Sequence, residues 1–211
     1  MTLTHRAAFA TLALFVVASA SHAQIKAVLY NKSGKAMGAA VLDTKLKSDG
    51  ILEMYMILKG SAGTLKISET FTASGMPIEQ VVTGGPQGAP VKIDIKYGAA
   101  SAKMTATGKD KSNSRTFPYP KGANVKERNN LWFVRRRPRV GEMDAYSDLD
   151  VQTMAWKAMT TKYAGDEKLK YHGKLVNAHK LVSNDYTTWL DDKGLPYRSE
   201  NRKTNELLVR Q

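Results

Sequence analysis

The chain contains no cysteine among its 211 residues, so neither disulfide bonds nor thiolate metal sites are available to it. It has no apolar run long enough to cross a bilayer as a helix, which takes roughly 20 residues. It also lacks a GxSxG motif, a phosphate-binding glycine loop and a dinucleotide fingerprint. These absences favour a protein without a cofactor and without an enzymatic role. Catalytic groups that converge only in the folded chain would not be detected this way.

The first 23 residues have the organisation of an export signal. Thr4-His5-Arg6 gives a polar and basic start, residues 7–18 are apolar apart from one threonine, and Ser21-His22-Ala23 supplies small residues at the positions that a signal peptidase requires. We therefore expect residues 1–23 to be a cleaved signal peptide and Gln24 to begin the mature chain. Because Gln24 is not cysteine, a typical acylated lipoprotein is not expected. The expected location is the periplasm, with full secretion as the alternative.

Acidic residues are scarce, with 19 Asp and Glu against 32 Lys and Arg. Arg6 leaves with the predicted signal and no acid does, so the net charge falls only from +13 to +12. A positive field of this size attracts a lipid or another anionic amphiphile, a membrane surface, an acidic glycan or an acidic protein partner. Export argues against nucleic acid. The alternative is a solvated basic surface with no dedicated ligand, and the sequence does not predict an oligomeric state.

Residues 24–211 have the pattern of a single β-rich domain. Turn-forming residues recur in the first half at 31–34, 48–50, 59–63, 74–75 and 84–88. The segments between them predict strands at 39–46, 51–58, 64–72, 78–83 and 91–97. Within 91–97, Lys92, Asp94 and Lys96 alternate with apolar residues. This period of two indicates an antiparallel sheet with one buried face.

The segment 109–140 is basic and contains prolines, and it predicts an insertion within the domain. Pro118 and Pro120 cannot donate to a strand ladder, and residues 124–134 predict a short helix. Further strands are expected at 142–149, 153–164, 168–171, 175–182, 186–190 and 195–200, with a last edge strand at 206–210. About a dozen strands in one sheet require strong curvature. The predicted fold is therefore a mostly β, curved antiparallel sheet with one short helical insertion, as a half-barrel or open barrel, and a closed barrel is the alternative.

Residues 130–200 have a recognisable order of elements. Trp132 and the basic segment with proline come before Val140-Gly141. After them come three segments, namely Lys162-Tyr163-Ala164-Gly165-Asp166-Glu167, His172-Gly173-Lys174 and Trp189-Leu190-Asp191-Asp192-Lys193-Gly194-Leu195-Pro196. This order resembles exported bacterial domains of unknown function that share the half-barrel of the lipoprotein carriers LolA and LolB. The resemblance implies a curved sheet around a concave apolar interior, which in the carriers accepts acyl chains. No individual residue is carried over from it.

The densest candidate site combines arginines with aromatic residues. Its residues are Trp132, Phe133, Arg135, Arg136, Arg137 and Arg139. Guanidinium groups match the oxygen atoms of phosphates and carboxylates, and an indole can stack on a sugar or hold an acyl chain. We therefore predict that these residues bind the ligand. In the alternative, the arginines are solvated and the aromatic residues pack in the core.

The remaining polar residues do not predict catalysis or a metal site. His172 and His179 are the only histidines after residue 23, and their spacing lacks the converging ligands that zinc requires. We expect His172 in a turn and His179 in the next strand. Asp191 and Asp192 lie in an Asp-Asp-Lys-Gly sequence, which is ordinary turn chemistry.

Overall fold

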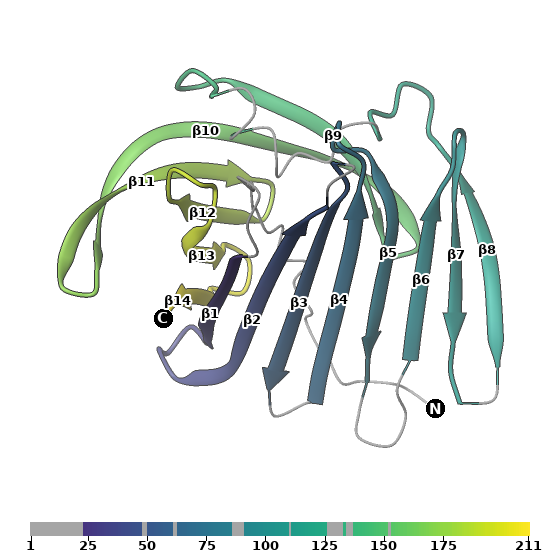
Figure 1. Ribbon diagram of the computed structural model, residues 1–211, viewed down its shortest axis with the longest axis horizontal. Coiled ribbons are helices and arrows are strands. Elements are labelled where there is room, and N and C mark those ends of the chain that lie inside the picture. The colour runs from purple at the N-terminus through teal and green to yellow at the C-terminus, as the bar shows by residue number, and fades with distance from the viewer. Residues whose placement is uncertain are drawn as a thin grey trace.

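In the computed structural model, the described residues form one antiparallel sheet of 14 strands (Figure 1). The described residues are 23–47, 50–60, 63–85, 91–109, 111–125, 133, 137–151 and 153–211. The strands are β1 (Ala23–Tyr30), β2 (Ala36–Leu46), β3 (Leu52–Gly60), β4 (Gly63–Phe71), β5 (Pro77–Gly84), β6 (Val91–Tyr97), β7 (Ser101–Thr107), β8 (Ser112–Pro118), β9 (Met143–Asp150), β10 (Ala155–Tyr171), β11 (Lys174–Ser183), β12 (Tyr186–Leu190), β13 (Pro196–Asn201) and β14 (Leu207–Arg210). The prediction of a curved, mostly β domain is confirmed.

The order of strands places both ends of the described chain in the middle of the sheet. From one edge to the other, the order is β8 to β1, then β14 to β9. The strands β1 and β14 pair over Ala27 to Tyr30 and Leu207 to Arg210. The prediction that residues 206–210 form an edge strand is therefore wrong, because β14 lies between β1 and β13. The edge strands are β8 and β9.

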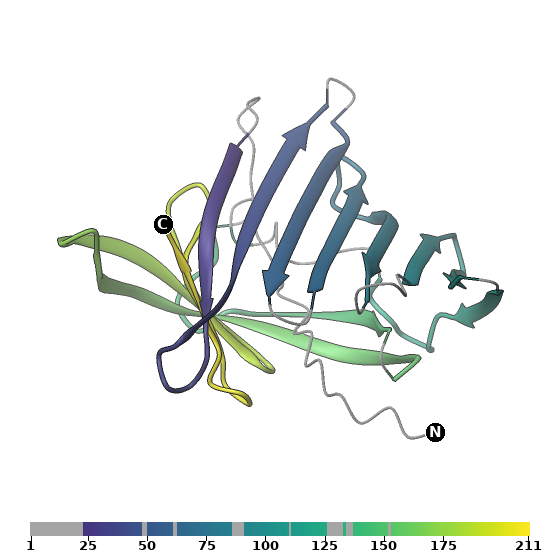
Figure 2. The same cartoon turned by 90° about the horizontal axis from the view of Figure 1, so that it is seen from below.

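No ladder of hydrogen bonds joins the two edge strands of the sheet, but side chains from its two edges pack against each other. Ile95 of β6, Met104 of β7 and Phe117 of β8 share one buried apolar cluster with Leu149 of β9. Figure 2 shows the hairpins of β9 to β11 curling beneath the strands β3 to β8. The face of β6 to β8 that carries this cluster is therefore the inner face of a curled sheet. Burial of apolar surface, and not a ladder, holds the two edges together.

A second and larger cluster lies on the same face near the middle of the sheet. It contains Ile25, Ala27, Ala40, Leu42, Leu52, Met54, Met56, Phe71, Leu195 and Leu208. These residues come from the strands around the β1–β14 junction and from the turn before β13. The junction of the first and last strands of the described chain is thus a part of the core.

The strands β1 and β7 have no counterpart among the predicted ranges, and two further strand assignments differ from the predictions for identifiable reasons. Residues 112–118 belong to β8, although the sequence predicts an insertion over 109–140. Pro118 is tolerated there because it ends an edge strand, where no further ladder needs its missing N–H group. The two strands predicted at 153–164 and 168–171 form one 17-residue strand, β10. Gly165, with φ of 102°, shifts the register in place of a turn.

Several expectations lie mainly outside the described residues. The signal peptide predicted at 1–23 is described only at Ala23, which begins β1. Of the helix predicted at 124–134, only Asn124, Val125 and Phe133 are described. Within the described part of the chain, no helix has the length and apolar character needed to cross a membrane.

Candidate functional site

A continuous row of apolar side chains crosses the inner face of the sheet. Residues that pair directly in an antiparallel ladder project from the same face. The ladders join Leu42, Met56, Ile67, Val82, Ile93 and Ala106, one residue from each strand from β2 to β7. We call these six residues the inner row.

The side chains of the inner row are not equally buried. Leu42 and Met56 are buried in the core cluster near the β1–β14 junction. The other four residues are half-buried, and two of them pack against the apolar clusters, Ile67 against the core cluster and Ile93 against the cluster that joins the two edges. Because no charged residue interrupts the row, its half-buried part is an apolar surface on the inner side of the curl. Such a surface suits an apolar ligand.

A polar pair stands beside the inner row on the same face. Glu69 pairs across the ladders with Met54 and with Gln80, and Gln80 pairs with Ile95. The side-chain nitrogen of Gln80 donates a hydrogen bond of 2.6 Å to Glu69 Oε1. Gln80 is only 4% exposed. Burial of polar groups is costly unless they are hydrogen-bonded. This pair is a hydrogen-bonded polar position on the inner face, where Thr44, paired with Met54, is a second buried polar residue.

The predicted arginine and aromatic site is described at three of its six positions. Phe133 is buried and packs with Tyr163, Leu181 and Leu190. Its ring centroid lies 5.3 Å from that of Tyr163 and 4.8 Å from that of His179. Phe133 therefore occupies the core, as the alternative interpretation expected. Trp132, Arg135 and Arg136 lie outside the described residues.

The two described arginines of this site differ in their surroundings. The guanidinium carbon of Arg137 lies 5.7 Å from the centre of the Phe133 ring, and its Nη2 donates to the main-chain oxygen of Asp192 at 3.1 Å. Arg139 is exposed, and its main-chain N–H donates to Glu142 Oε2 at 3.0 Å. The structure thus brings Phe133 and Arg137 together and places Arg139 at the surface.

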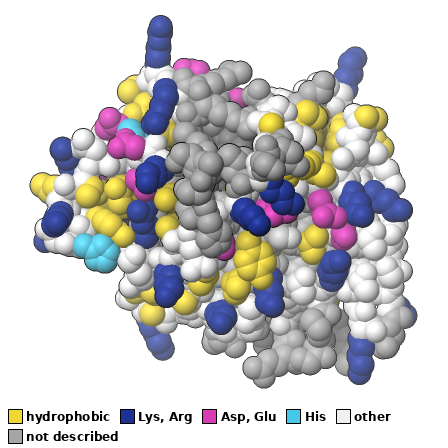
Figure 3. Space-filling view, in the orientation of Figure 1, with side chains coloured by type: hydrophobic (Ala, Val, Ile, Leu, Met, Phe, Trp, Pro, Cys, Tyr) yellow, Lys and Arg dark blue, Asp and Glu magenta, His cyan; other side chains and the backbone are white. Residues whose placement is uncertain are grey.

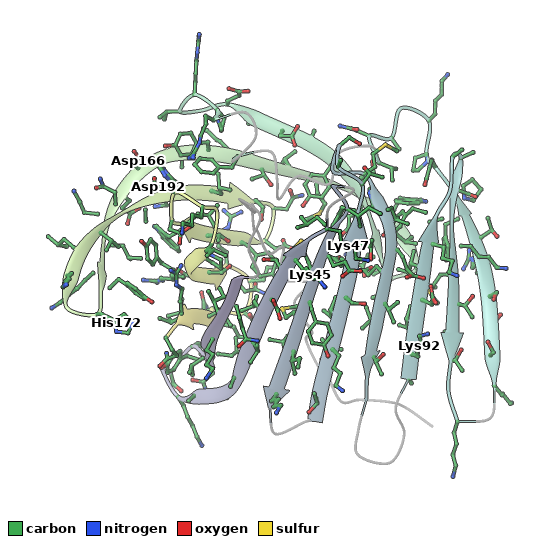
Figure 4. All side chains as sticks on the ribbon, in the orientation of Figure 1. Lys45, Lys47, Lys92, Asp166, His172 and Asp192 are labelled. Atoms are coloured by element: carbon green, nitrogen blue, oxygen red, sulfur yellow. The ribbon has the colours of Figure 1, made fainter. Side chains whose placement is uncertain are left out.

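Phe133 packs beside a chain of hydrogen bonds that the sequence analysis missed. The Tyr163 hydroxyl donates to Asp166 Oδ1 at 2.6 Å, and the same oxygen lies 2.6 Å from His179 Nδ1. His179 Nε2 lies 2.9 Å from Asp192 Oδ1. Figure 4 shows Asp166, on β10, close to Asp192, in the turn after β12. We call Tyr163, Asp166, His179 and Asp192 the histidine cluster.

The environment of the histidine cluster shifts two of its pKa values. The hydrogen bond from Tyr163, followed by that from His179, lowers the pKa of the Asp166 carboxyl below its ordinary value. Burial, together with the Asp166 carboxylate, raises the pKa of Tyr163 to about 12. Both effects favour a neutral tyrosine that donates to an ionised aspartate. The hydrogen bond between Tyr163 and Asp166 is thus made by a neutral hydroxyl and an ionised carboxylate.

The histidine cluster joins separate elements of the fold. Both ring nitrogens of His179 face carboxylate oxygens, Nδ1 that of Asp166 and Nε2 that of Asp192. Across the described ranges, no three histidine, aspartate or glutamate side chains are arranged to hold a metal ion. The cluster ties β10 and β11 to the turn that precedes β13.

The pairing of Asp166 with His179 could have been found from the sequence. The turn predicted at His172-Gly173 is the centre of the β10–β11 hairpin, and Tyr171 pairs with Lys174 beside it. Counting outward from the turn places Asp166 and His179 six residues away on opposite strands, where they pair. The approach of Asp192 carries no such signal, because it depends on how the next hairpin folds back.

The fold and the described site together define a β-rich domain with a β-barrel-like architecture. The chain is similar to a crystal structure of a β-barrel-like protein of a domain of unknown function, DUF1849, from Brucella abortus. The similarity has a TM-score of 0.56 at 9% sequence identity and covers 90% of this chain and 94% of that one. At this identity, the similarity concerns the fold alone. No protein-family model matches the chain. No curated protein matches it either.

Proposed function

We propose that the chain is an exported, periplasmic, non-enzymatic protein that binds the apolar part of an amphiphile on the inner face of its sheet. The observation that carries this proposal is the inner row, whose residues Ile67, Val82, Ile93 and Ala106 are half-buried inside the curl. Apolar surface of this kind gains free energy when an apolar ligand covers it. Each buried methylene of the ligand contributes about 0.8 kcal/mol before the cost of ordering is subtracted.

Two further observations support an acyl chain as the apolar part. The sequence between residues 130 and 200 resembles the lipoprotein carriers, whose half-barrel accepts acyl chains. The net charge of +12 that would remain after removal of residues 1–23 favours an anionic amphiphile over a neutral or cationic one.

Two adjacent valines of β5 give a matched test of this proposal. Val82 pairs with Ile67 on the inner face, whereas Val81 pairs with Ser68 on the opposite face, and both are half-buried. We expect Val82→Lys to weaken the binding of a dansyl-labelled fatty acid at least about ten-fold, because the ligand would have to pass over a charged group. Val81→Lys should bind the probe as the wild type does.

The binding titration is paired with thermal unfolding, so that a misfolded variant is recognised. Equal binding by the two folded variants, or no saturable binding by the wild type, would overturn the proposal. Export is tested separately, by fractionating cells that express the full chain and sequencing the N terminus of the periplasmic protein. We expect Gln24 as the first residue, and retention of residues 1–23 would contradict the proposed export.

A further inference from the structure

The β10–β11 hairpin extends beyond the ladders that join it to the rest of the sheet. The strand β9 pairs with β10 only over Ala155 to Lys162, and β12 pairs with β11 only over His179 to Val182. In the described ladders, the residues from Glu167 to Ala178 therefore pair only with each other across the hairpin. Figure 1 shows this hairpin reaching past the other strands on the side where β14 ends.

One side of the hairpin tip rests on the body of the protein. The ring centroid of Tyr171 lies 4.8 Å from that of Tyr197 on β13. The Tyr171 hydroxyl also donates to the main-chain oxygen of Gln211 at 3.3 Å. These contacts fix the direction in which the hairpin points, so its other side faces solvent in a defined orientation.

The solvent-facing side of the tip combines an exposed leucine with basic residues. Leu175 is 72% exposed, and it pairs directly with Lys170. Lys168 projects on the same side as Lys170, two residues earlier in the strand. His172 and Lys174 are exposed at the turn, where Lys174 pairs with Tyr171 and so projects from the opposite side of the hairpin. We call Lys168, Lys170, His172, Lys174 and Leu175 the tip patch.

The acidic residues of this hairpin nearest to the tip patch are Asp166, on the same face as Lys168, and Glu167. The residues from Lys168 to Leu175 include no aspartate or glutamate. The three lysines of the tip patch take no part in the ion pairs found among the described residues, whereas Lys180, further along β11, pairs with Glu167. In Figure 3, basic side chains lie around hydrophobic surface at this end of the molecule, with acidic side chains beside them, and Figure 4 labels His172 at the turn.

We infer that the tip patch docks the protein onto the surface of an anionic phospholipid bilayer. Lysine is depleted at protein–protein interfaces. At a membrane surface, by contrast, lysines bind anionic headgroups while an apolar side chain enters the boundary between headgroups and acyl chains. The patch has this composition, with one protruding leucine among three lysines. This inference concerns the outer surface and does not depend on a ligand of the inner face.

The test compares two triple variants that carry the same net charge. The tip variant is Lys168→Gln, Lys170→Gln and Lys174→Gln. The control variant is Lys103→Gln, Lys111→Gln and Lys121→Gln, which removes three exposed lysines from β7 and from the segments that flank β8. Co-sedimentation is measured with vesicles of phosphatidylcholine alone and with vesicles that also contain phosphatidylglycerol.

We expect the wild type to bind the phosphatidylglycerol vesicles and not the phosphatidylcholine vesicles, with weaker binding at high salt. A lysine at an anionic surface contributes about five-fold in affinity, so the tip variant should bind roughly 100-fold more weakly. The control variant should lose less than about five-fold, because its substitutions lie away from the tip. Leu175→Ser should weaken binding about ten-fold without changing the charge.

Three results would overturn the inference. Equal losses in the two triple variants would show that binding follows net charge and not the tip. Unchanged binding by the tip variant would show that the tip patch does not contact the membrane, and that it is either solvated or contacts a protein partner. Absence of wild-type binding to phosphatidylglycerol vesicles would remove the membrane as a partner. All the substituted side chains are exposed, so thermal unfolding should be nearly the same for every variant.

Discussion

Replacing Leu149 by alanine would remove the β9 side chain that packs with the opposite edge of the sheet. Leu149 is 2% exposed, and it shares its cluster with Ile95, Met104 and Phe117 of β6, β7 and β8. Truncation of a buried leucine costs the lost burial plus the cavity that remains, roughly 2–5 kcal/mol in total. We expect a loss in the upper half of this range, because three strands surround the site and cannot all collapse into the cavity.

The control for this variant makes the same chemical change at an exposed position. Leu175→Ala alters a side chain that is 72% exposed, so it should change stability by no more than about 0.5 kcal/mol. Urea denaturation followed by circular dichroism gives the free energy of unfolding for both variants. If Leu149→Ala costs no more than Leu175→Ala, the packing between the two edges described above is wrong.

A double-mutant cycle tests whether the two edges act together. Phe117 on β8 and Leu149 on β9 belong to one cluster, yet no ladder joins their strands. We expect the combined variant Phe117→Ala with Leu149→Ala to deviate from additivity by about 0.5–3 kcal/mol, as is found for residues that share a cavity. Strictly additive losses would show that the two edges are energetically independent.

Two further predictions concern the backbone and the histidine cluster. Gly38→Ala should destabilise the protein by about 1–3 kcal/mol, because the new Cβ would lie 2.1 Å from the main-chain oxygen of Lys59, whereas Gly108→Ala meets no atom within 4 Å and should be nearly neutral. Urea denaturation of both variants measures this, and equal effects would contradict the close approach of β2 and β3. Tyr163→Phe should raise the pKa of Asp166, since it removes the first of the hydrogen bonds that lower it. A lowered carboxyl pKa stabilises the fold above the ordinary value of 3.8, and this stability is lost as the pH falls through the lowered pKa. An NMR titration of the Asp166 carboxyl measures the shift, and an unchanged value would exclude the tyrosine as its cause.

Local patterns in the sequence were sufficient to predict most of the strands. The alternation at 91–97 corresponds to β6, where Ile93 and Ile95 pair with inner-face residues of β5. The turn at His172-Gly173 is the centre of the β10–β11 hairpin. Both features depend on residues that are neighbours in the chain, and such patterns are visible in a single sequence.

The features that the sequence did not predict depend on distant pairing or on polar composition. The pairing of β14 with β1 joins the first and last strands of the described chain, and no local pattern records it. Apart from Phe117 and Pro118, the residues of β8 are polar. The strand lies at the edge of the sheet, so most of its side chains are exposed and no apolar pattern marks it in the sequence. For Phe133, in the predicted arginine site, the sequence left open whether the ring packs in the core or contacts a ligand. Its packing against Tyr163, which is distant in the sequence, places it in the core.

The most direct test of ligand binding inside the curl uses the absence of cysteine in the chain. A single Val82→Cys substitution can be labelled uniquely with an environment-sensitive fluorophore, and Val81→Cys places the same label on the opposite face of β5. On titration with an unlabelled fatty acid, we expect a saturable change in emission from the label at position 82 and none from the label at position 81. Equal responses at the two positions, or a response at position 81 alone, would contradict the claim that the inner face binds the ligand.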